Sequence, residues 1–219
     1  MNNAPDGIPQ NSRKIDTLLP KTDKIVILQL LELFSKVDQR SSQLKNDSGI
    51  HCPDRCAQCC ATAQVETTAI EMLPLAVELW RTNQADTYLE LIDATQGSRK
   101  CVFLNQDPDA PNNGRCAIYT LRPLICRLFG FFTIRNKYGK YVYGGCKIIR
   151  EKYPEAHQKA MSLIAAHTHP SLLTDYTIQI ISMGCALDRK MVPINLAAKL
   201  ALEKVGLEIH KRAAIKIDN

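Results

Sequence analysis

The sequence lacks any long apolar run and has no apolar leader. Nowhere in its 219 residues do about 18 apolar residues follow one another, so no segment is suited to cross a membrane as a helix. Residues 1–10 are polar and contain two prolines, whereas a secretory signal carries an apolar core at this place. We therefore expect a cytoplasmic protein without a membrane partner.

Signatures of common enzyme chemistry are also missing. The sequence has neither a glycine-rich phosphate-binding loop nor a dinucleotide-binding fingerprint, and it contains no internal repeat. No Ser-His-Asp or Cys-His arrangement can be identified, so no catalytic residue is assigned and the question of enzyme activity stays open. The net charge of +6 permits an acidic partner, but surface lysines and arginines are ordinarily solvated, and nucleic acid is not an expected partner.

The composition is that of a folded globular protein. Hydrophobic residues make up 45% of the chain and charged residues 23%, values that exclude disorder for most of its length. A chain of this length predicts one domain, or one domain with helical extensions. Against this ordinary background the nine cysteines stand out. An odd count in a long chain without an export signal disfavours a disulfide framework and favours metal binding or redox chemistry.

Four of the cysteines form a compact segment that reads C-x3-C-x2-C-C. Thiols this close together on a sharply turning chain can converge on one centre. Four more cysteines follow near expected loops and element ends, where the backbone is free to aim a ligand. The predicted metal ligands are Cys52, Cys56, Cys59, Cys60, Cys101, Cys116, Cys126 and Cys146.

The number of thiols allows more than one metal centre. Eight thiolates hold two tetrahedral zinc ions, or one zinc ion and one iron–sulfur cluster, and thiolates accept both zinc and iron. Adjacent Cys59 and Cys60 point in different directions in most backbone conformations. They serve different metals, or one ligates while the other packs. Cys185 lies far along the chain in a helical region, and we interpret it as a buried small apolar residue.

Helical periodicity flanks the cysteines on both sides. A first helix is expected to be capped by Thr22 or Asp23, and 46–49 supplies its stop. Its apolar positions are Ile27, Leu30, Leu31, Phe34 and Val37. A Thr-x-x-Glu capping box at Thr68 opens a helix reaching about Thr95, with Pro74 tolerated only in its first turn.

The chain between 98 and 145 is irregular. We expect a loop over 107–114, a short helix over 119–128 that Pro123 interrupts, and a β-hairpin over 131–143. Helices are expected to return over 154–167 and 171–182. A last helix begins at Pro193 and has an apolar stripe formed by Ala198, Leu202, Val205 and Ile209.

These elements predict a mainly α fold with a small, irregular α+β cysteine-rich metal-binding centre that contains a β-hairpin. The predicted parts are a flexible polar leader (1–20), an N-terminal helix (21–49), a cysteine-cluster metal-binding domain (50–147) and C-terminal helices packing on it (148–219).

The cysteine segments resemble a known family. Cys52–Cys60 is followed by Arg115-Cys116-Ala117-Ile118-Tyr119 and by Arg122-Pro123-Leu124-Ile125-Cys126-Arg127-Leu128-Phe129. Together they resemble the CxxCxxCC zinc- or iron-chelating family, the YkgJ-like cysteine cluster proteins, over roughly 50–147. The resemblance implies cysteines that bind zinc or iron, and it implies no fixed reaction. Flagellin lysine N-methylases carry a similar segment in a longer chain, and that extra length is missing here, so methylation is not transferred.

Other residues of this pattern have physical roles available to them. Arg122 and Arg127 can donate hydrogen bonds to metal-bound sulfur, although surface ion pairs are the alternative. Tyr119 and Phe129 can wall the site from water, although core packing alone explains them as well. His51, next to the first cysteine, can replace a thiolate, but a solvent-facing side chain is favoured.

Two functions follow as hypotheses. The first is a cysteine-cluster protein that chelates zinc or iron, including an iron–sulfur centre, in a structural or redox role. The alternative is an iron–sulfur or open-site metalloenzyme, such as a methyltransferase-like modifier of a protein substrate. Cys52, Cys56 and Cys59 also match the spacing of radical S-adenosylmethionine enzymes, but the sequence shows no run of alternating strands and helices for their barrel. Closed four-thiolate sites favour the first function, and an open metal position beside a pocket favours the second.

Overall fold

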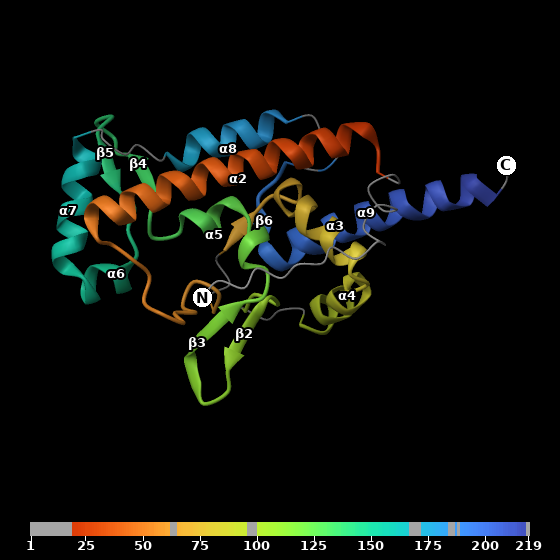
Figure 1. Cartoon of the computed structure of the whole chain (residues 1–219), viewed down its shortest axis with the longest axis horizontal. Helices are drawn as coiled ribbons and strands as arrows, with labels where there is room; N and C mark the ends of the chain where they lie inside the picture. Colours follow the sequence, from red (N-terminus) through yellow and green to blue (C-terminus); the bar gives the residue numbers. More distant parts are fainter. Residues whose placement is uncertain are drawn as a thin grey trace, which may run out of the picture.

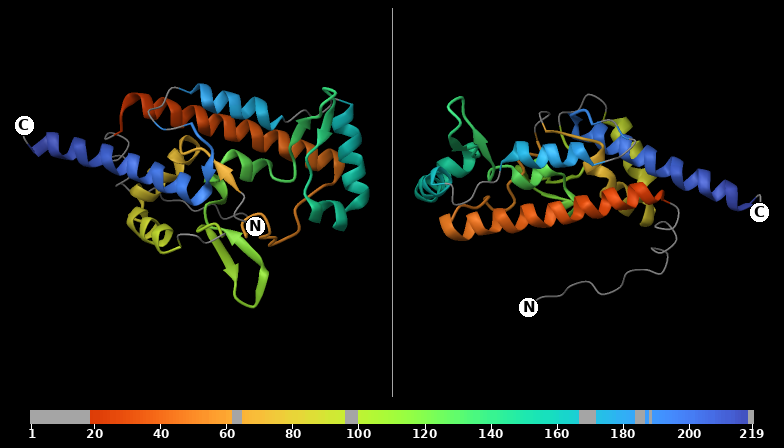
Figure 2. Two further views of the ribbon diagram at one scale, coloured as in Figure 1. Left: turned by 180° about the vertical axis from the view of Figure 1, so that it is seen from behind. Right: turned by 90° about the horizontal axis from the view of Figure 1, so that it is seen from above.

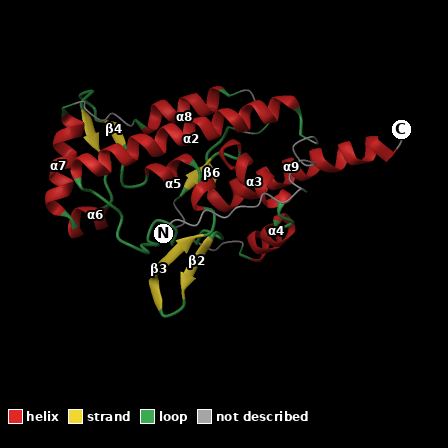
Figure 3. Cartoon of the chain, viewed as in Figure 1, coloured by secondary structure: helices red, strands yellow, loops and turns green. Residues whose placement is uncertain are grey.

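In the part of the chain that the structure describes, helices dominate and three small two-stranded sheets complete the fold (Figures 1 and 3). The computed structural model describes residues 19–61, 65–95, 100–166, 172–183, 187 and 189–217. The mainly α fold with a small α+β portion is therefore confirmed. Almost all of the expected leader, 1–20, and Cys185 lie outside the described residues. Within the described part of the chain, no helix is long and apolar enough to span a membrane.

The long helix α2 (Lys21–Ser48) is the longest element and runs along one side of the molecule (Figure 1). Its start differs from the prediction, because Pro20 takes the N-cap position and no side chain caps the helix. Gly49 ends it in the left-handed conformation at φ 82°, donating its N–H to the Lys45 carbonyl at 2.8 Å. The apolar stripe is largely confirmed, but Leu31 is 39% exposed.

The capping box forms as predicted. Thr68 and Glu71 exchange hydrogen bonds, with the Glu71 N–H donating to Thr68 Oγ1 and the Thr68 N–H donating to Glu71 Oε1. A 3-10 turn (Ile70–Met72) leads into α3 (Leu73–Arg81), which has Pro74 in its first turn. The expected single helix to Thr95 is wrong, since Asn83 turns left-handed at φ 56° and a separate helix, α4 (Ala85–Ala94), follows.

The larger hydrophobic core, called core 1 below, joins α3 and the first half of α2 to α9 (Ile194–Ile217). The predicted stripe on α9 is confirmed, because Ala198, Leu202 and Val205 are buried in core 1 and Ile209 packs against it. Pro193 does not open this helix. It belongs to β6 (Val192–Pro193), which pairs with β1 (Glu66–Thr67) just before the helix begins.

A second and smaller core, core 2, lies at the other end of α2. It collects buried side chains from that end and from the elements after the cysteines, namely Leu44, Ile50, Phe131, Ile149, Ala160 and Ile164. The surrounding elements are β4 (Thr133–Arg135), β5 (Tyr141–Tyr143), α6 (Lys147–Lys152) and α7 (Pro154–Ala165). They gather at this end in every view, whereas the end of α9 extends at the opposite side (Figure 2).

The β4–β5 pair confirms the predicted hairpin, and a further hairpin was missed. Strands β2 (Leu104–Asp107) and β3 (Ala110–Cys116) pair where the sequence predicted a loop over 107–114. The Asp109 N–H donates to Asp107 Oδ1 and closes the turn between the two strands. Residues of a type common in loops therefore form the turn and the strand ends of this hairpin. The interrupted helix is confirmed as a 3-10 turn (Tyr119–Leu121) followed by α5 (Leu124–Leu128). Helix α8 (Leu173–Ser182) packs against α5 and β4.

Candidate metal centre

All eight cysteines of the described chain line one cavity of about 560 Å³. They come from separate segments, and their thiols are free. Seven are partly buried and Cys52 is exposed. The structure therefore brings the cysteines of the predicted ligand set together around this cavity, namely Cys52, Cys56, Cys59, Cys60, Cys101, Cys116, Cys126 and Cys146.

The first four cysteines lie on an irregular segment made of tight turns. The Cys56 N–H donates to the Pro53 carbonyl at 3.2 Å, and Arg55 adopts the left-handed conformation at φ 54° to make this turn. The Cys60 N–H donates to the Ala57 carbonyl at 2.9 Å, which makes a second turn. We call this segment, 52–60, the cysteine segment.

Strand β3 fixes the cysteine segment in place. The Gly114 N–H donates to the Arg55 carbonyl at 2.9 Å, and Cys56 forms an isolated antiparallel bridge with Asn113. A Cβ atom on Gly114 would lie 2.8 Å from the Asn105 carbonyl oxygen and 3.3 Å from Ala57. Glycine is thus required at this point, because the hairpin and the cysteine segment approach each other closely.

The later cysteines are carried by short regular elements. Cys101 precedes β2, and its N–H donates to the Cys60 carbonyl at 3.0 Å. Cys116 ends β3 opposite Leu104. Cys126 lies within α5, and Cys146 is the N-cap residue of α6. The cavity is therefore enclosed by the ends of elements that meet only in the folded chain.

The thiols face one cavity but do not form a ready-made coordination shell. Cys59 Sγ and Cys60 Sγ are 3.9 Å apart. Among the described residues, no three His, Cys, Asp or Glu side chains are arranged as a group that could hold a metal ion. Ligation therefore requires thiols to move toward a common point, and the turns of the cysteine segment are the parts that can shift at least cost.

The electrostatics of the cavity favour protonated thiols at most positions. Burial raises the pKa of Cys101 to about 12, and it also raises the pKa of Cys126 and of Cys116. Cys59 is the exception, since the hydrogen bond from Cys60 lowers its pKa to about 7 and the nearby Arg122 acts in the same direction. The same hydrogen bond, followed by burial, raises the pKa of Cys60. The cavity thus suits a cation that takes the place of several protons.

Arg122 is one of the cations that line the cavity beside the thiols. Its charge opposes the rise that burial causes in the pKa values of Cys116 and Cys126. At Cys59 it adds to the lowering of the pKa that comes mainly from the Cys60 hydrogen bond. Its guanidinium lies 3.8 Å from the centre of the Tyr119 ring. Its buried Nε has no hydrogen-bond partner within the described part of the chain. Arg122 therefore keeps one donor without a partner while its side chain lines the cavity.

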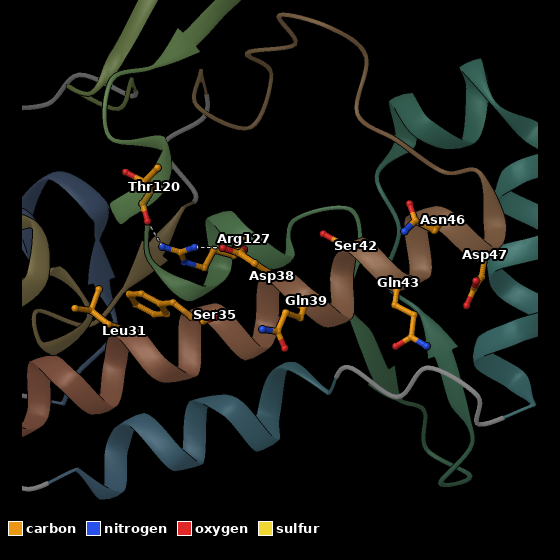
Figure 4. A pocket seen from close by; sticks show the side chains of 11 residues that line it. Leu31, Ser35, Asp38, Gln39, Ser42, Gln43, Asn46, Asp47, Thr120 and Arg127 are labelled. Atoms are coloured by element: carbon orange, nitrogen blue, oxygen red, sulfur yellow. Dashed lines mark hydrogen bonds and ion pairs between the residues drawn. The ribbon is translucent and has the colours of Figure 1, made fainter. Parts of the chain in front are cut away.

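Arg127 lines the cavity as Arg122 does, and its guanidinium is also held by partners outside the cysteines. Its side chain is 3% exposed, and its Nε donates to the Arg122 carbonyl at 2.8 Å. Its two terminal nitrogens donate to Asp38 Oδ2 and to the Thr120 carbonyl, both at 2.5 Å (Figure 4). The guanidinium also lies over the Phe34 ring. Arg127 thus ties the turn before α5 to α2, along a surface groove that runs beside the helix.

The other predicted neighbours of the site are placed as follows. Tyr119 and Phe129 line the cavity, but they remain 58% and 38% exposed, so the cavity has an open mouth. His51 is exposed and is directed elsewhere, since its ring stacks on Tyr153 at 4.0 Å between ring centres. Lys45 of α2 also lines the cavity. The sequence offers no sign of this role, because Lys45 belongs to a helix outside the cysteine motifs.

The comparisons with known proteins agree with this chemistry. A family model named CxxCxxCC, with the description "putative zinc- or iron-chelating domain", matches residues 51–161, just over half of the chain. The chain belongs to this family. No curated protein and no solved structure matched the chain.

Membership in the CxxCxxCC family gives a zinc- or iron-chelating role, and the donor set fits it. Thiolates are soft ligands that bind zinc and iron well. The chain has three residues between Cys52 and Cys56, where the family's name has two between its first two cysteines. The left-handed turn at Arg55 accommodates these three residues and keeps both cysteines on the cavity.

Proposed function

We propose that this CxxCxxCC protein binds zinc or iron through its eight clustered cysteines. The observation that carries the proposal is the convergence of cysteines from distant segments on one cavity. Unrelated buried thiols would be spread over the cores. The proposed ligands are Cys52, Cys56, Cys59, Cys60, Cys101, Cys116, Cys126 and Cys146, and Arg122 is the cation that offsets their negative charge.

The main role that we propose is to stabilise the fold around the cavity. The cavity walls are turns, short strands and short helices, which bury little apolar surface of their own. Structural zinc contributes on the order of 10–16 kcal/mol of apparent binding free energy at neutral pH. A bound metal would therefore join the hairpin β2–β3, α5, α6 and the cysteine segment into one unit. If iron is the resident metal, a thiolate-bound cluster gives the same cavity a redox role.

Free thiols of this kind are compatible with a reducing compartment. In an oxidising compartment neighbouring thiols form disulfides, whereas glutathione and thioredoxin keep cytosolic thiols reduced. The Sγ atoms of Cys59 and Cys60 lie close together as free thiols. We therefore propose a cytoplasmic location, with the metal ion as the principal partner.

A specific observation also favours an open-site metalloenzyme as the second candidate. The mouth of the cavity carries two exposed aromatic rings, Tyr119 and Phe129, and the donor-bearing Arg122 has an unpartnered Nε. Such a mouth can hold a substrate beside a metal. The two candidates differ in coordination, because a fold-stabilising centre is closed by protein ligands and a catalytic centre keeps an open position.

Cysteine-to-serine substitutions test the proposed ligand set. Cys56→Ser and Cys59→Ser should lower both the metal content and the melting temperature of the protein. Cys185→Ser should leave the metal content unchanged and is the control. Metal content is measured after anaerobic purification, and melting is followed by circular dichroism. If Cys56→Ser and Cys59→Ser keep the full metal content and the wild-type melting temperature, the assignment is wrong.

A further inference from the structure

We propose that the first metal ion binds in a small recess beside the cavity, where Cys59, Cys60, Cys101 and Cys126 form a four-thiolate shell around a single ion. This inference rests on the proposed function and adds which of the clustered thiols hold the first ion. The remaining thiols line the cavity outside the recess, and they take metal after the recess is filled. These are Cys52, Cys56, Cys116 and Cys146.

The recess is walled by sulfur and by apolar side chains. It has a volume of about 20 Å³. Its lining residues are Cys59, Cys60, Val65, Cys101, Ile125, Cys126, Phe129 and Ile194. A space of this size is close to that of one water molecule, so it suits one ion and is too small for a cluster of four irons. Among the side chains of this lining, only the thiols can bind a metal.

Two of these thiols already have the separation that a tetrahedral thiolate site requires. Zinc–sulfur bonds are about 2.3 Å long, so neighbouring sulfur atoms of a tetrahedral site are roughly 3.8 Å apart. The Sγ atoms of Cys59 and Cys60 are 3.9 Å apart. One edge of the coordination shell is therefore present in the folded chain.

A tight turn brings these two adjacent cysteines to the recess together. From the sequence, adjacent cysteines are expected to serve different metals, or one of them to pack instead of ligating. In the structure the N–H groups of Cys60 and Ala61 both donate to the Ala57 carbonyl, at 2.9 and 3.0 Å. Cys59 and Cys60 both line the recess from this turn, so both can ligate the same ion.

The other two ligands are held in place by the surrounding fold. The Cys101 N–H donates to the Cys60 carbonyl at 3.0 Å, which fixes these residues beside each other. Cys126 lies within α5, and both Cys101 and Cys126 pack against core 1. Because protein interiors are close-packed, these two thiols stay in place while the turn that carries Cys59 and Cys60 adjusts to complete the shell.

The apolar wall of the recess is fixed from the opposite end of the chain. The Ile194 N–H, at the start of α9, donates to the Val65 carbonyl at 3.0 Å, next to the pair β1–β6. Both side chains are buried. This wall keeps water from one side of the sulfur atoms, so we expect a bound ion to exchange slowly.

The recess should fill first because its ligands need the least rearrangement. A preorganised site loses less free energy in ordering its ligands than a site that must be assembled. Outside the recess, Cys52 is exposed and Cys146 packs against core 2, so a shell built from them must gather thiols from different parts of the molecule. The thiols of the recess release their protons to solvent as the ion binds.

The functional consequence is a separation of roles within the cavity. A shell of four protein thiolates leaves no open position on the metal. The ion in the recess therefore stabilises the fold by joining the cysteine segment, the start of β2 and α5. Any reaction at an open metal position belongs to the wider part of the cavity, beside Tyr119.

Cysteine variants inside and outside the recess test this assignment in the full-length chain. Cys60→Ser and Cys126→Ser each remove one proposed recess ligand. Cys52→Ser and Cys146→Ser are the matched controls from the wider cavity. Each protein is stripped of metal under reducing conditions and titrated with Co²⁺, because four-thiolate cobalt sites have intense visible bands. Competition with a chelator gives the affinity for the first equivalent, and far-UV circular dichroism reports the fold.

The first equivalent of Co²⁺ should give the four-thiolate spectrum in the wild type and in both control variants. In Cys60→Ser and Cys126→Ser this spectrum should change. The affinity should fall by at least about tenfold, because removing a ligand costs more than removing one of its supporting partners. An unchanged first equivalent in the recess variants, or an equal loss in the controls, would overturn the recess assignment while the proposed function stands.

A measurement on the wild type keeps the test decisive even if a variant folds poorly. The chain is alkylated with iodoacetamide with and without one equivalent of Zn²⁺, and peptide mass spectrometry locates the protected thiols. Zinc should protect Cys59 and Cys60, and it should leave the rate at Cys52 unchanged. Protection of Cys52 at one equivalent, or no protection of Cys59 and Cys60, would overturn the assignment. A wild-type chain that binds no zinc, cobalt or iron would overturn the proposed function, and this inference with it.

Discussion

Replacing Arg122 and Arg127 separately by methionine should produce different losses, although both arginines face Asp38. The Arg122 guanidinium lies 3.9 Å from Asp38, whereas Arg127 donates to Asp38 and to two backbone carbonyls from a buried position. Arg127→Met should therefore cost stability. Arg122→Met should instead raise the pKa of Cys59 somewhat, because the Arg122 charge adds to the lowering of this pKa that comes mainly from the Cys60 hydrogen bond.

The magnitudes follow from these contacts. Arg127 donates two hydrogen bonds to backbone carbonyls, and such bonds from a charged donor contribute about 1.5–3 kcal/mol each. The pair with Asp38 adds at most about 1 kcal/mol, since 45% of that side chain is exposed. Methionine fills part of the space and removes the desolvation cost of a buried cation, which offsets some of the loss. We expect a net loss of about 3 kcal/mol, equal to a fall of roughly 6–12 °C in Tm for a chain of this size.

The Arg122→Met variant is the matched control for stability. Its ion pair is long and half-exposed on the Asp38 side, so we expect a loss below about 1 kcal/mol. Thermal melting of both metal-free proteins measures the difference. Alkylation of Cys59 at pH 7 measures the second effect, and it should slow only in Arg122→Met. Equal falls in Tm for the two variants, or an unchanged alkylation rate in Arg122→Met, would refute the separation of roles.

Three further predictions concern the metal-free protein and core 1. Cys59 should react first with iodoacetamide at neutral pH, because its pKa is lowered to about 7, and peptide mass spectrometry that finds Cys101 equally fast would contradict this. Burial raises the pKa of Cys101 from its ordinary 9.0 to about 12 on folding, so the contribution of this thiol to stability is complete below pH 9 and is lost toward pH 12. Denaturant titrations should show that the free energy of unfolding falls between pH 9 and pH 12. A free energy of unfolding that stays constant over this range would contradict the prediction. A Cβ atom on Gly206 would lie 2.5 Å from the Trp80 ring, so Gly206→Ala should lower stability by about 1–3 kcal/mol with metal content unchanged. An unchanged melting temperature for Gly206→Ala would contradict this prediction, because it would show that the Trp80 ring moves aside without a loss of stability.

The helices could be predicted where local signals determine them. The apolar spacing of α2 and the capping box at Thr68 are properties of neighbouring residues, and both predictions hold in the structure. The break at Asn83 was missed because a single residue in the left-handed conformation does not change the spacing of the apolar residues around it. Leu31 fits the apolar period but is exposed, since it lies beside the surface groove rather than under core 1.

The missed hairpin shows where local reasoning ends. The residues of 107–114 are rich in Asp, Pro, Asn and Gly, and such residues are typical of loops. In the structure they form strand ends because of partners elsewhere, as in the pair of Leu104 with Cys116 and the bridge of Asn113 with Cys56. Strand pairing depends on these cross-strand contacts more than on intrinsic preference.

The candidate site divides in the same way. Spacing and residue type predicted the cysteines that the structure places around one cavity, because thiols near turns and element ends have few other roles. Cys101, Cys116 and Cys126 pack against core 1 and Cys146 packs against core 2, and this placement depends on tertiary contacts that spacing does not predict. The role of Arg127 was also out of reach, since its partner Asp38 is 89 residues away along the chain. Cys185 and the leader, 1–20 apart from its last two residues, are outside the described part and keep their predictions.

Metal analysis of the anaerobically purified chain, with an absorption spectrum of the same sample, tests the central claim most directly. The account predicts stoichiometric zinc or iron, and it predicts that chelation lowers the melting temperature. A colourless zinc protein would support the fold-stabilising role, and a brown iron protein with acid-labile sulfide would support the redox role. A folded, metal-free protein that binds neither Zn²⁺ nor Fe²⁺ on titration, and whose melting temperature no chelator changes, would contradict the account.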